Sequence, residues 1–294
     1  MDEVDFYLED LKSKFRKLKN VGGYDKYYLS YSGGKDSHLL YWLIKEYSYP
    51  EFKEIKIVGI NTYMEHHQIR DRILKNSDVV LYPKLKPMEI KQKYGIPCFS
   101  KIQDEYIMRY QKGCRTASLM MHIEGYAFKG NDEKIYTTLF KLNNKARNLL
   151  LTNKLHKISP KCCYYLKKKT AKDYEKETGK RAILGVRGEE GAMRKTQYKS
   201  CFTKDKKFTP LYDLSDELLD KIYKKYNIEI PEVYKHIERT GCMGCPYGSY
   251  GGDTEKELEL LNDNQRQFVM KYFKESYEVL GIHSQTTIFD FIED

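Results

Sequence analysis

The segment Ser32-Gly33-Gly34-Lys35-Asp36-Ser37 constrains the fold of this chain more than any other feature. A run rich in β-formers, residues 27–31, leads into it, and an amphipathic helical pattern follows from Leu39 to Ile44. Glycines in such a strand-to-helix turn let backbone N–H groups converge on a phosphate, and the helix N-terminus adds its positive dipole end. The spacing is not that of a Walker loop, which has four residues between its glycine and Gly-Lys-Ser/Thr. The segment predicts a phosphate site at the edge of a sheet.

The chain around this segment alternates between strand and helix patterns. Residues 4–20, 65–75 and 87–94 have helical spacing, whereas residues 55–60, 78–82 and 181–186 are short apolar runs typical of buried strands. This rhythm predicts an α/β fold with a doubly wound, mostly parallel sheet that binds ligands at the carboxyl ends of its strands.

The remaining segments are expected to be mainly helical. Helical patterns are expected between residues 100 and 150 and over residues 215–226, 255–262 and 263–279. We predict an N-terminal helix (1–24), a nucleotide-binding α/β domain (25–200) and a mainly helical C-terminal part (201–294) packed on the same core.

Composition limits the function classes. The 294 residues contain no apolar stretch long enough to span a membrane, and the acidic N-terminus lacks the apolar core of a signal peptide, so a cytoplasmic protein is expected. The formal net charge of +10 indicates either a polyanionic partner or simply a lysine-rich composition. Both interpretations stay open.

The loop residues have chemical roles that follow from their types. Ser32 and Ser37 offer hydroxyls, Gly33 and Gly34 backbone N–H groups, and Lys35 a mobile positive charge for a departing pyrophosphate. Asp36 is either a ligand for the Mg²⁺ that accompanies ATP or a cap of the following helix. We predict that all six bind the nucleotide and that Lys35 and Asp36 act in catalysis.

Two arginines follow the strand predicted at residues 181–186. Arg187, after Gly185, and Arg194 are predicted to make bidentate contacts with phosphate or sulfate oxygens, and Arg187 is also predicted to act in catalysis. Glu190 and Arg194 are equally consistent with an ordinary i,i+4 helix pair.

Five of the seven cysteines form motif-like groups. Cys162-Cys163 and Cys242-x-x-Cys245 together offer four thiolates to a [4Fe–4S] cluster or to Zn²⁺. Adjacent cysteines favour the [4Fe–4S] cluster, because they can bind irons at different corners of its cube. A third interpretation is that these cysteines are redox-active or free thiols. Cys201 could replace one of the adjacent pair or act as a sulfur-handling nucleophile.

Together these blocks resemble the phosphoadenosine phosphosulfate reductase family of the ATP pyrophosphatase (PP-loop) superfamily, over about residues 25–275. The similar blocks are Ser32–Ser37, Tyr94–Pro97 with Ser100-Lys101, Lys161–Cys163 with Leu166-Lys167, Gly185-x-Arg187-x-x-Glu190, Pro210–Glu217 and Arg239–Cys245. The chain departs from the family pattern at Gly191, where serine is usual, and at Leu214, where tryptophan is usual. The resemblance implies an adenine nucleotide α-hydrolase-like fold and, by analogy with iron–sulfur adenylyl-sulfate reductases, one [4Fe–4S] cluster on Cys162, Cys163, Cys242 and Cys245.

One difference from the reductases of this family changes the expected reaction. Those enzymes attack sulfur with a cysteine in a C-terminal Glu-Cys-Gly-x-His segment, whereas no cysteine follows Cys245 here. The lysine of the loop is typical of members that use ATP. The resemblance therefore implies an ATP-dependent adenylyl- or sulfurtransferase, similar to enzymes of DNA phosphorothioation and tRNA thiolation, that releases pyrophosphate from ATP·Mg²⁺.

Two other function classes stay open, namely a sulfonucleotide reductase with a relocated nucleophile such as Cys201 and a non-catalytic nucleotide- or nucleic-acid-binding module. The expected partners are a nucleotide substrate, a tRNA or DNA acceptor, a cysteine desulfurase or reductant protein, and a second copy of the chain. A membrane partner is not expected.

Overall fold

The computed structural model describes residues 2–129, 132–190, 198–238, 240–251 and 253–283. The chain divides into two compact units, each made of two segments. Unit 1 comprises Met1–Pro83 and Lys167–Thr240, and unit 2 comprises Lys84–Leu166 and Gly241–Asp294. The division into 1–24, 25–200 and 201–294 stays a prediction.

Unit 1 is built around a parallel sheet with helices before, between and after its strands. Its strands are β1 (Tyr27–Tyr31), β2 (Lys56–Ile60), β3 (Val79–Leu81) and β6 (Arg181–Ile183). Its α-helices are α1 (Glu3–Arg16), α2 (Lys35–Trp42), α3 (His67–Asn76), α8 (Lys169–Thr178) and α10 (Asp216–Lys225). Short 3₁₀ or π segments are η1 (Lys17–Val21), η2 (Tyr24–Lys26), η3 (Leu43–Tyr47), η5 (Gly188–Glu190) and η6 (Glu232–Lys235), and η4 (Tyr164–Lys168) leads into the second segment of the unit.

The four strands pair in the order β3-β2-β1-β6, and every pairing is parallel. Alternate residues of these strands face opposite sides. Tyr28, Val58 and Ala182 share one face, where they pack against Tyr174 of α8. Gly59 lies on the opposite face, since a Cβ added there would come within 2.6 Å of the Ile73 side chain of α3. Helices thus cover both faces, and the predicted doubly wound α/β fold is confirmed.

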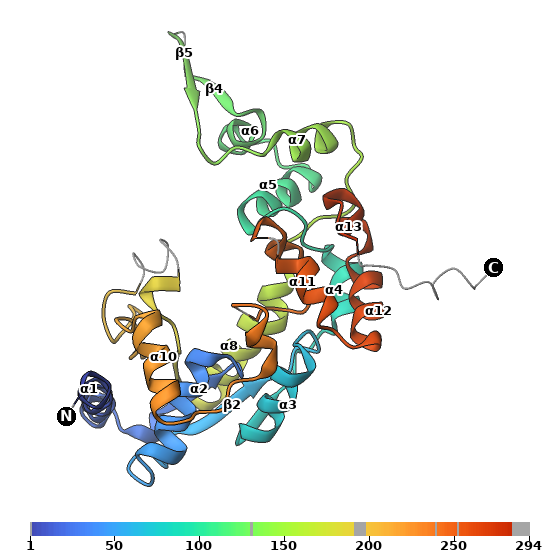
Figure 1. Ribbon diagram of the computed structural model, residues 1–294. Coiled ribbons are helices and arrows are strands. Elements are labelled where there is room, and N and C mark those ends of the chain that lie inside the picture. The colour runs from blue at the N-terminus through green and yellow to red at the C-terminus, as the bar shows by residue number, and fades with distance from the viewer. Residues whose placement is uncertain (1, 130–131, 191–197, 239, 252, 284–294) are drawn as a thin grey trace. The chain divides into compact units, whose positions relative to one another are not determined.

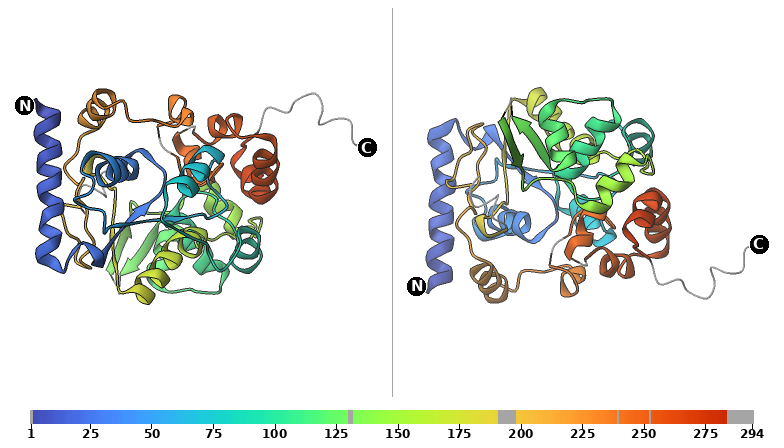
Figure 2. Two further views of the ribbon diagram at one scale, coloured as in Figure 1. Left: turned by 90° about the horizontal axis from the view of Figure 1, so that it is seen from below. Right: turned by 90° about the horizontal axis from the view of Figure 1, so that it is seen from above.

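The N-terminal helix is shorter than its apolar pattern predicts. α1 is a straight helix (Figure 2) that begins at an Asp2 cap, and the chain tightens into the 3₁₀ segment η1 after Arg16. Gly22, with φ of +124°, ends this segment in a conformation that only glycine adopts readily. The buried side chains of α1 include Leu8, Leu11 and Phe15.

Unit 2 is mainly helical. Its helices are α4 (Pro87–Tyr94), α5 (Lys101–Gln111), α6 (Ala117–Glu124), α7 (Asn144–Leu151), η7 (Pro246–Gly251), α11 (Asp253–Glu259), α12 (Asp263–Tyr272) and α13 (Lys274–Leu280). The helix predicted over 263–279 is two helices, because Phe273 leaves the helical conformation with φ of −100° and ψ of +11°.

The prediction of a helical region over residues 100–150 is wrong in one part. β4 (Tyr126–Lys129) and β5 (Asp132–Thr137) pair as an antiparallel hairpin that projects from α6 (Figure 1). Aromatic and β-branched residues dominate these strands, and a Gly-Asn dipeptide separates them in the sequence. Together these features indicate a hairpin more strongly than a helix.

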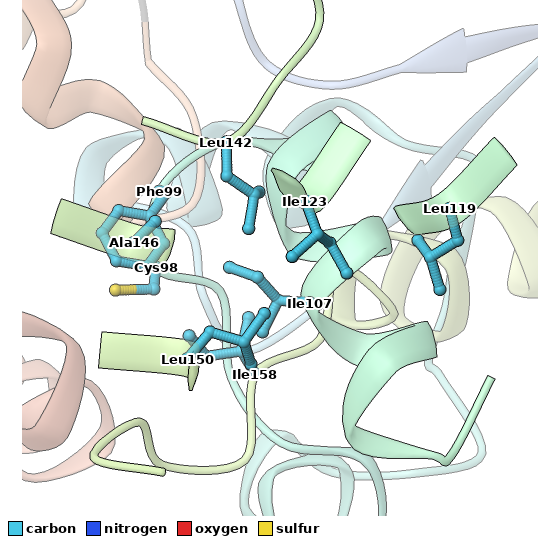
Figure 3. Close-up of a cluster of buried hydrophobic side chains, with 9 residues drawn as sticks. All are labelled: Cys98, Phe99, Ile107, Leu119, Ile123, Leu142, Ala146, Leu150 and Ile158. Carbon is cyan, nitrogen blue, oxygen red and sulfur yellow. The ribbon is translucent and has the colours of Figure 1, made fainter. Parts of the chain in front are cut away.

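The core of the first segment of unit 2 joins α5, α6 and α7. Figure 3 shows its nine buried side chains, which are Cys98, Phe99, Ile107, Leu119, Ile123, Leu142, Ala146, Leu150 and Ile158. Cys98 is fully buried and acts as a small apolar residue, as expected of a cysteine outside a motif. Within the described ranges, the structure contains no helix both long and apolar enough to cross a membrane.

Candidate nucleotide site and cysteine cluster

The glycine loop lies at the point where the strand order of the sheet reverses. From β1 the chain adds β2 and β3 on one side, and β6 later pairs with β1 on the other side. In doubly wound sheets this reversal opens a crevice at the carboxyl ends of the two central strands, and ligands bind there. Ser32–Gly34 directly follow β1, and Leu184–Arg187 directly follow β6, so both predicted blocks lie at the crevice.

Hydrogen bonds within the loop fix its shape. The Ser37 hydroxyl donates to the Gly34 carbonyl (3.1 Å) and accepts from the Ser32 backbone N–H (3.2 Å). The Ser32 and Ser37 hydroxyl oxygens are 3.0 Å apart. Gly33 has φ of +74°, and a Cβ there would come within 3.0 Å of the Ile69 carbonyl oxygen. Ser37 is buried and holds the loop, whereas Ser32 is exposed and able to reach a ligand.

Lys35 is the first residue of α2 and lies among tyrosines. Its ammonium group is 5.0 Å from the centroid of the Tyr234 ring, and its backbone carbonyl accepts a hydrogen bond from the Tyr223 hydroxyl (2.7 Å). A cation over an aromatic face keeps its charge and is attracted only weakly, so it can move to a stronger anion. This position suits a lysine that meets a phosphate group.

Arg187 is buried and bound to two carboxylates. Its Nε donates to Asp36 (2.6 Å) and its Nη2 to Asp216 (2.7 Å). Burial disfavours the charge, but the two carboxylates outweigh it and raise the pKa of Arg187. Gly34 is the N-cap of α2, so Asp36 lies in the first turn and is not the cap. Here Arg187 holds Asp36 in place from the end of β6.

Gly185 lets the β6 segment approach the loop. A Cβ at this position would lie 2.8 Å from the Ser37 backbone nitrogen and 2.9 Å from the Asp36 carbonyl carbon. A close approach to backbone atoms requires glycine. The other predicted arginine, Arg194, lies outside the described residues.

A third polar segment, not among the predicted site residues, lies at the carboxyl end of β2. Asn61 directly follows this strand, and its side chain accepts from the Tyr63 N–H (3.0 Å). Tyr63 has φ of +67°, rare for a tyrosine, and its side chain is 41% exposed. Glu65 is buried and accepts hydrogen bonds from the Thr62 N–H (2.9 Å) and hydroxyl (2.6 Å). Polar residues directly after a buried strand are the sequence pattern that could have indicated this segment. No sequence pattern indicated that Tyr223 and Tyr234 lie beside Lys35.

A buried histidine stands behind the loop on α2. The Asn76 side chain donates to the Tyr31 hydroxyl (3.0 Å), which lies 2.9 Å from His38 Nδ1 and can donate to it. Burial, and secondarily Arg72, lowers the pKa of His38 to about 3. The imidazole is therefore neutral at physiological pH and accepts at Nδ1.

His38→Gln is expected to flatten the pH dependence of stability in acid. The pKa of His38 is lower when folded (about 3) than when unfolded (about 6.5), so only the unfolded chain gains a proton between these values. This contribution is complete above pH 6.5 and is lost as the pH falls towards 3, by at most about 1.4 kcal/mol per pH unit. The check is the melting temperature of both proteins from pH 7.5 to 5; identical slopes would contradict the assignment.

The second candidate site lies in unit 2, where Cys242–Cys245 form a tight turn. The Cys245 N–H donates to the Cys242 carbonyl (3.1 Å), and the Gly244 N–H donates to Glu257 (3.0 Å). Gly244 has φ of +61°, and its carbonyl accepts from the Tyr277 hydroxyl. The Cys245 carbonyl accepts from Thr254 (3.0 Å). The C-x-x-C turn is thus held from α11 and α13.

Cys162 and Cys163 lie beside this turn. The Cys163 side chain, by hydrogen bonding, and then burial raise the pKa of Cys162, and negative charge on Cys242 and Cys245 would raise it further. Burial raises the pKa of Tyr272, and negative charge on the same four cysteines would raise this pKa further. The four cysteines predicted as ligands therefore interact in one electrostatic environment.

Negative charge on the neighbouring cysteines disfavours ionisation of Cys162 and Cys245, and positively charged irons or zinc would relieve this repulsion. The donor chemistry thus fits either metal group. The positions are not those of a closed site: in the described part of the chain, no three His, Cys, Asp or Glu side chains form a group that could hold a metal ion. The seven cysteines, all within the described ranges, form no disulfide.

Cys201 lies in unit 1 against α1. Burial raises the pKa of its thiol, and Lys14 and Lys17 oppose this change. The thiol is therefore protonated at neutral pH, a state that disfavours nucleophilic attack.

Comparison with known proteins found no matching family model and no matching curated protein. Among solved structures, the chain is similar to phosphoadenylyl-sulfate (PAPS) reductase from Candida auris in its phosphate complex, with a TM-score of 0.43 and 12% identity over 80% of this chain and 92% of that chain. It is also similar to NH₃-dependent NAD synthetase from Campylobacter jejuni in complex with nitrate ion, with a TM-score of 0.38 and 14% identity over 98% of this chain and 100% of that chain.

Proposed function

We propose that this chain is an ATP pyrophosphatase-type enzyme of the PP-loop superfamily, related to the phosphoadenosine phosphosulfate reductase family. In this proposal it cleaves ATP between the α- and β-phosphates and transfers AMP to an acceptor, in preparation for sulfur transfer. The observation that carries it is the position of Ser32–Lys35 at the strand-order reversal, beside the Arg187–Asp36 pair.

The reaction follows from the charges at this crevice. An acceptor oxygen attacks the α-phosphorus, the bond to the β-phosphate breaks, and the acceptor loses a proton. Negative charge develops on the departing pyrophosphate, where the loop N–H groups, the start of α2 and Lys35 stabilise it. Asp36, held by Arg187, is the proposed Mg²⁺ ligand. A sulfur donor then displaces AMP from the acceptor.

The test is the identity of the products. With ATP labelled at the α-phosphate and Mg²⁺, we expect AMP, free or bound to an acceptor, together with pyrophosphate. Formation of ADP and inorganic phosphate would refute cleavage at the α-phosphate. Nucleotide binding with neither product, in the presence of acceptor, would instead support a binding module.

We further propose that Cys162, Cys163, Cys242 and Cys245 hold a [4Fe–4S] cluster. The shared electrostatic environment of the four thiols and the turn at Gly244 support this assignment. When bound, such a cluster can supply electrons or bind sulfur. The residues of the chain hold the C-x-x-C turn, and the buried Tyr272 and Tyr277 lie near these cysteines.

Cys242→Ser is expected to remove most of the iron from anaerobically purified protein. A cluster loses stability when one of its four thiolates is replaced by a weaker ligand. The measurements are iron and acid-labile sulfide per chain, with Cys98→Ser as the control, since Cys98 lies in the apolar core of α5–α7. A colourless wild-type protein with one zinc per chain would refute the cluster in favour of zinc.

A further inference from the structure

The first segment of unit 2 is strongly basic. Residues 84–166, the first segment of unit 2, contain 16 Lys and Arg residues and 6 Asp and Glu residues. The formal net charge of this segment is therefore +10, the value for the whole chain. The remaining residues hold 36 basic and 36 acidic side chains. The second segment of unit 2, Gly241–Asp294, is acidic, with 4 basic and 10 acidic side chains, and unit 1 has 32 basic and 26 acidic side chains. Residues 84–166 are therefore the most basic of these parts, and their charge suits a polyanionic partner.

A pocket of about 400 Å³ opens within this same segment. It lies among α4, α5, α7 and the chain that follows α7. The residues that line it include the basic Lys112, Arg115 and Lys157 and the aromatic Tyr94 and Tyr110. Basic and aromatic side chains around one concavity are the combination that single-stranded nucleic acids require, for phosphates and for bases respectively.

Two of the lining residues, Arg115 and Tyr110, stack on each other. The guanidinium carbon of Arg115 lies 3.5 Å from the centroid of the Tyr110 ring. Arg115 Nη1 donates to the carbonyls of Tyr110 (2.7 Å) and Cys114 (2.8 Å) and so fixes the side chain in this position. Both bonds use one nitrogen, so the other N–H groups can meet a phosphate or a base edge. Nucleobases also stack on guanidinium planes.

Another lining residue, Tyr94, is a tyrosine near positive charges. Tyr94 stacks on Tyr165, with ring centroids 4.5 Å apart. A hydrogen bond with Tyr165, followed by the charges of Lys93 and Lys112, lowers the pKa of Tyr94. Lys157 also lines the pocket and donates to the Lys93 carbonyl (2.8 Å) at the end of α4. The field that lowers the pKa of Tyr94 would also attract a phosphate.

We propose that this pocket, with Lys112, Arg115, Tyr110 and Tyr94, binds one nucleotide of a single-stranded nucleic acid, and that residues 84–166 bind the flanking phosphates. The assignment of that nucleic acid as the AMP acceptor rests on the proposed function; its binding does not. An anionic membrane is the competing partner, but membrane insertion needs an exposed apolar face, whereas the apolar residues that line this concavity, such as Leu150 and Ile158, are buried.

The experiment measures binding of fluorescent single-stranded RNA and DNA of one mixed sequence to the full chain, over a series of salt concentrations. We expect the Lys112→Gln/Arg115→Gln variant to bind at least about tenfold more weakly than wild type. Its slope of log K against log salt should be smaller by about 1.4, or about 0.7 per lost phosphate contact. The matched control is Lys19→Gln/Lys53→Gln, which removes two exposed charges from unit 1.

A second pair of variants tests stacking without a change of charge. Tyr110→Leu keeps an apolar side chain beneath Arg115 and is expected to weaken binding about fivefold or more, whereas Tyr110→Phe is expected to bind like wild type. Equal loss in Lys112→Gln/Arg115→Gln and Lys19→Gln/Lys53→Gln would overturn the proposal. So would binding to phosphatidylserine-containing vesicles without binding to either oligonucleotide.

Pyrophosphate release separates the two proposals. If wild type releases pyrophosphate but binds neither oligonucleotide, the nucleic-acid proposal fails and the proposed function stands. If wild type binds oligonucleotide with the predicted variant pattern but forms no pyrophosphate when acceptor is present, the proposed function fails and the nucleic-acid proposal stands.

Discussion

Lys35→Ala is expected to slow pyrophosphate release from ATP by about 10²–10³-fold, the usual cost of removing one preorganised group that stabilises developing charge. Lys35 begins α2 at the strand-order reversal, and its ammonium group lies over the face of the Tyr234 ring, a weak interaction. It can therefore follow the charge that develops on the leaving pyrophosphate. The measurement is the initial rate of pyrophosphate release at saturating ATP and Mg²⁺.

Two further variants separate the charge of Lys35 from its place in the fold. Lys35→Arg keeps the charge but changes its shape, so we expect a smaller loss than with alanine. Lys53→Ala removes an exposed lysine from unit 1 and should release pyrophosphate like wild type. Because the half-buried Lys35 side chain points to one ring face, Lys35→Ala should melt close to wild type. An unchanged rate in Lys35→Ala would remove this lysine from the reaction.

The sequence predicts the sheet well because its strands are short, apolar and separated by clear helical patterns. Residues 55–60, 78–82 and 87–94 closely match β2, β3 and α4. The helical prediction for β4–β5 is wrong although its aromatic and β-branched residues and its Gly-Asn dipeptide favour a hairpin, because a short strand pattern inside a helical region is weak evidence until its pairing partner is known. Tertiary contacts, which local patterns do not contain, decide such cases.

The candidate site is only partly predictable for a related reason. The loop and Gly185-x-Arg187 are local motifs, and parallel topology brings them to one edge of the sheet. The partners of Arg187 are not local: Asp36 is 151 residues away along the chain. Contact of Arg187 with phosphate oxygens stays a prediction, and in the structure its guanidinium is bound to two carboxylates. The fold that joins β6 to α2 sets this contact.

The same close approach of β6 to α2 leads to the second large effect, which we expect from Gly185→Ala. The added Cβ would lie 2.8 Å from the Ser37 backbone nitrogen, a separation that forces one of the two segments to shift. Overpacking of this kind costs about 1–3 kcal/mol. Gly241→Ala is the matched control for stability, because no heavy atom lies within 4 Å of its added Cβ.

A shift at Gly185 would displace the loop as well as lower stability, and ATP binding distinguishes the two effects. A ligand that binds only the folded state raises the melting temperature by an amount set by its affinity. If Gly185→Ala merely destabilises the fold, saturating ATP and Mg²⁺ should raise its melting temperature as much as that of wild type. We expect a smaller rise, because the Ser37 backbone that meets the new Cβ belongs to the loop proposed to hold the phosphates. An equal rise would separate the β6 segment from nucleotide binding and leave the contact at Gly185 with a purely structural role.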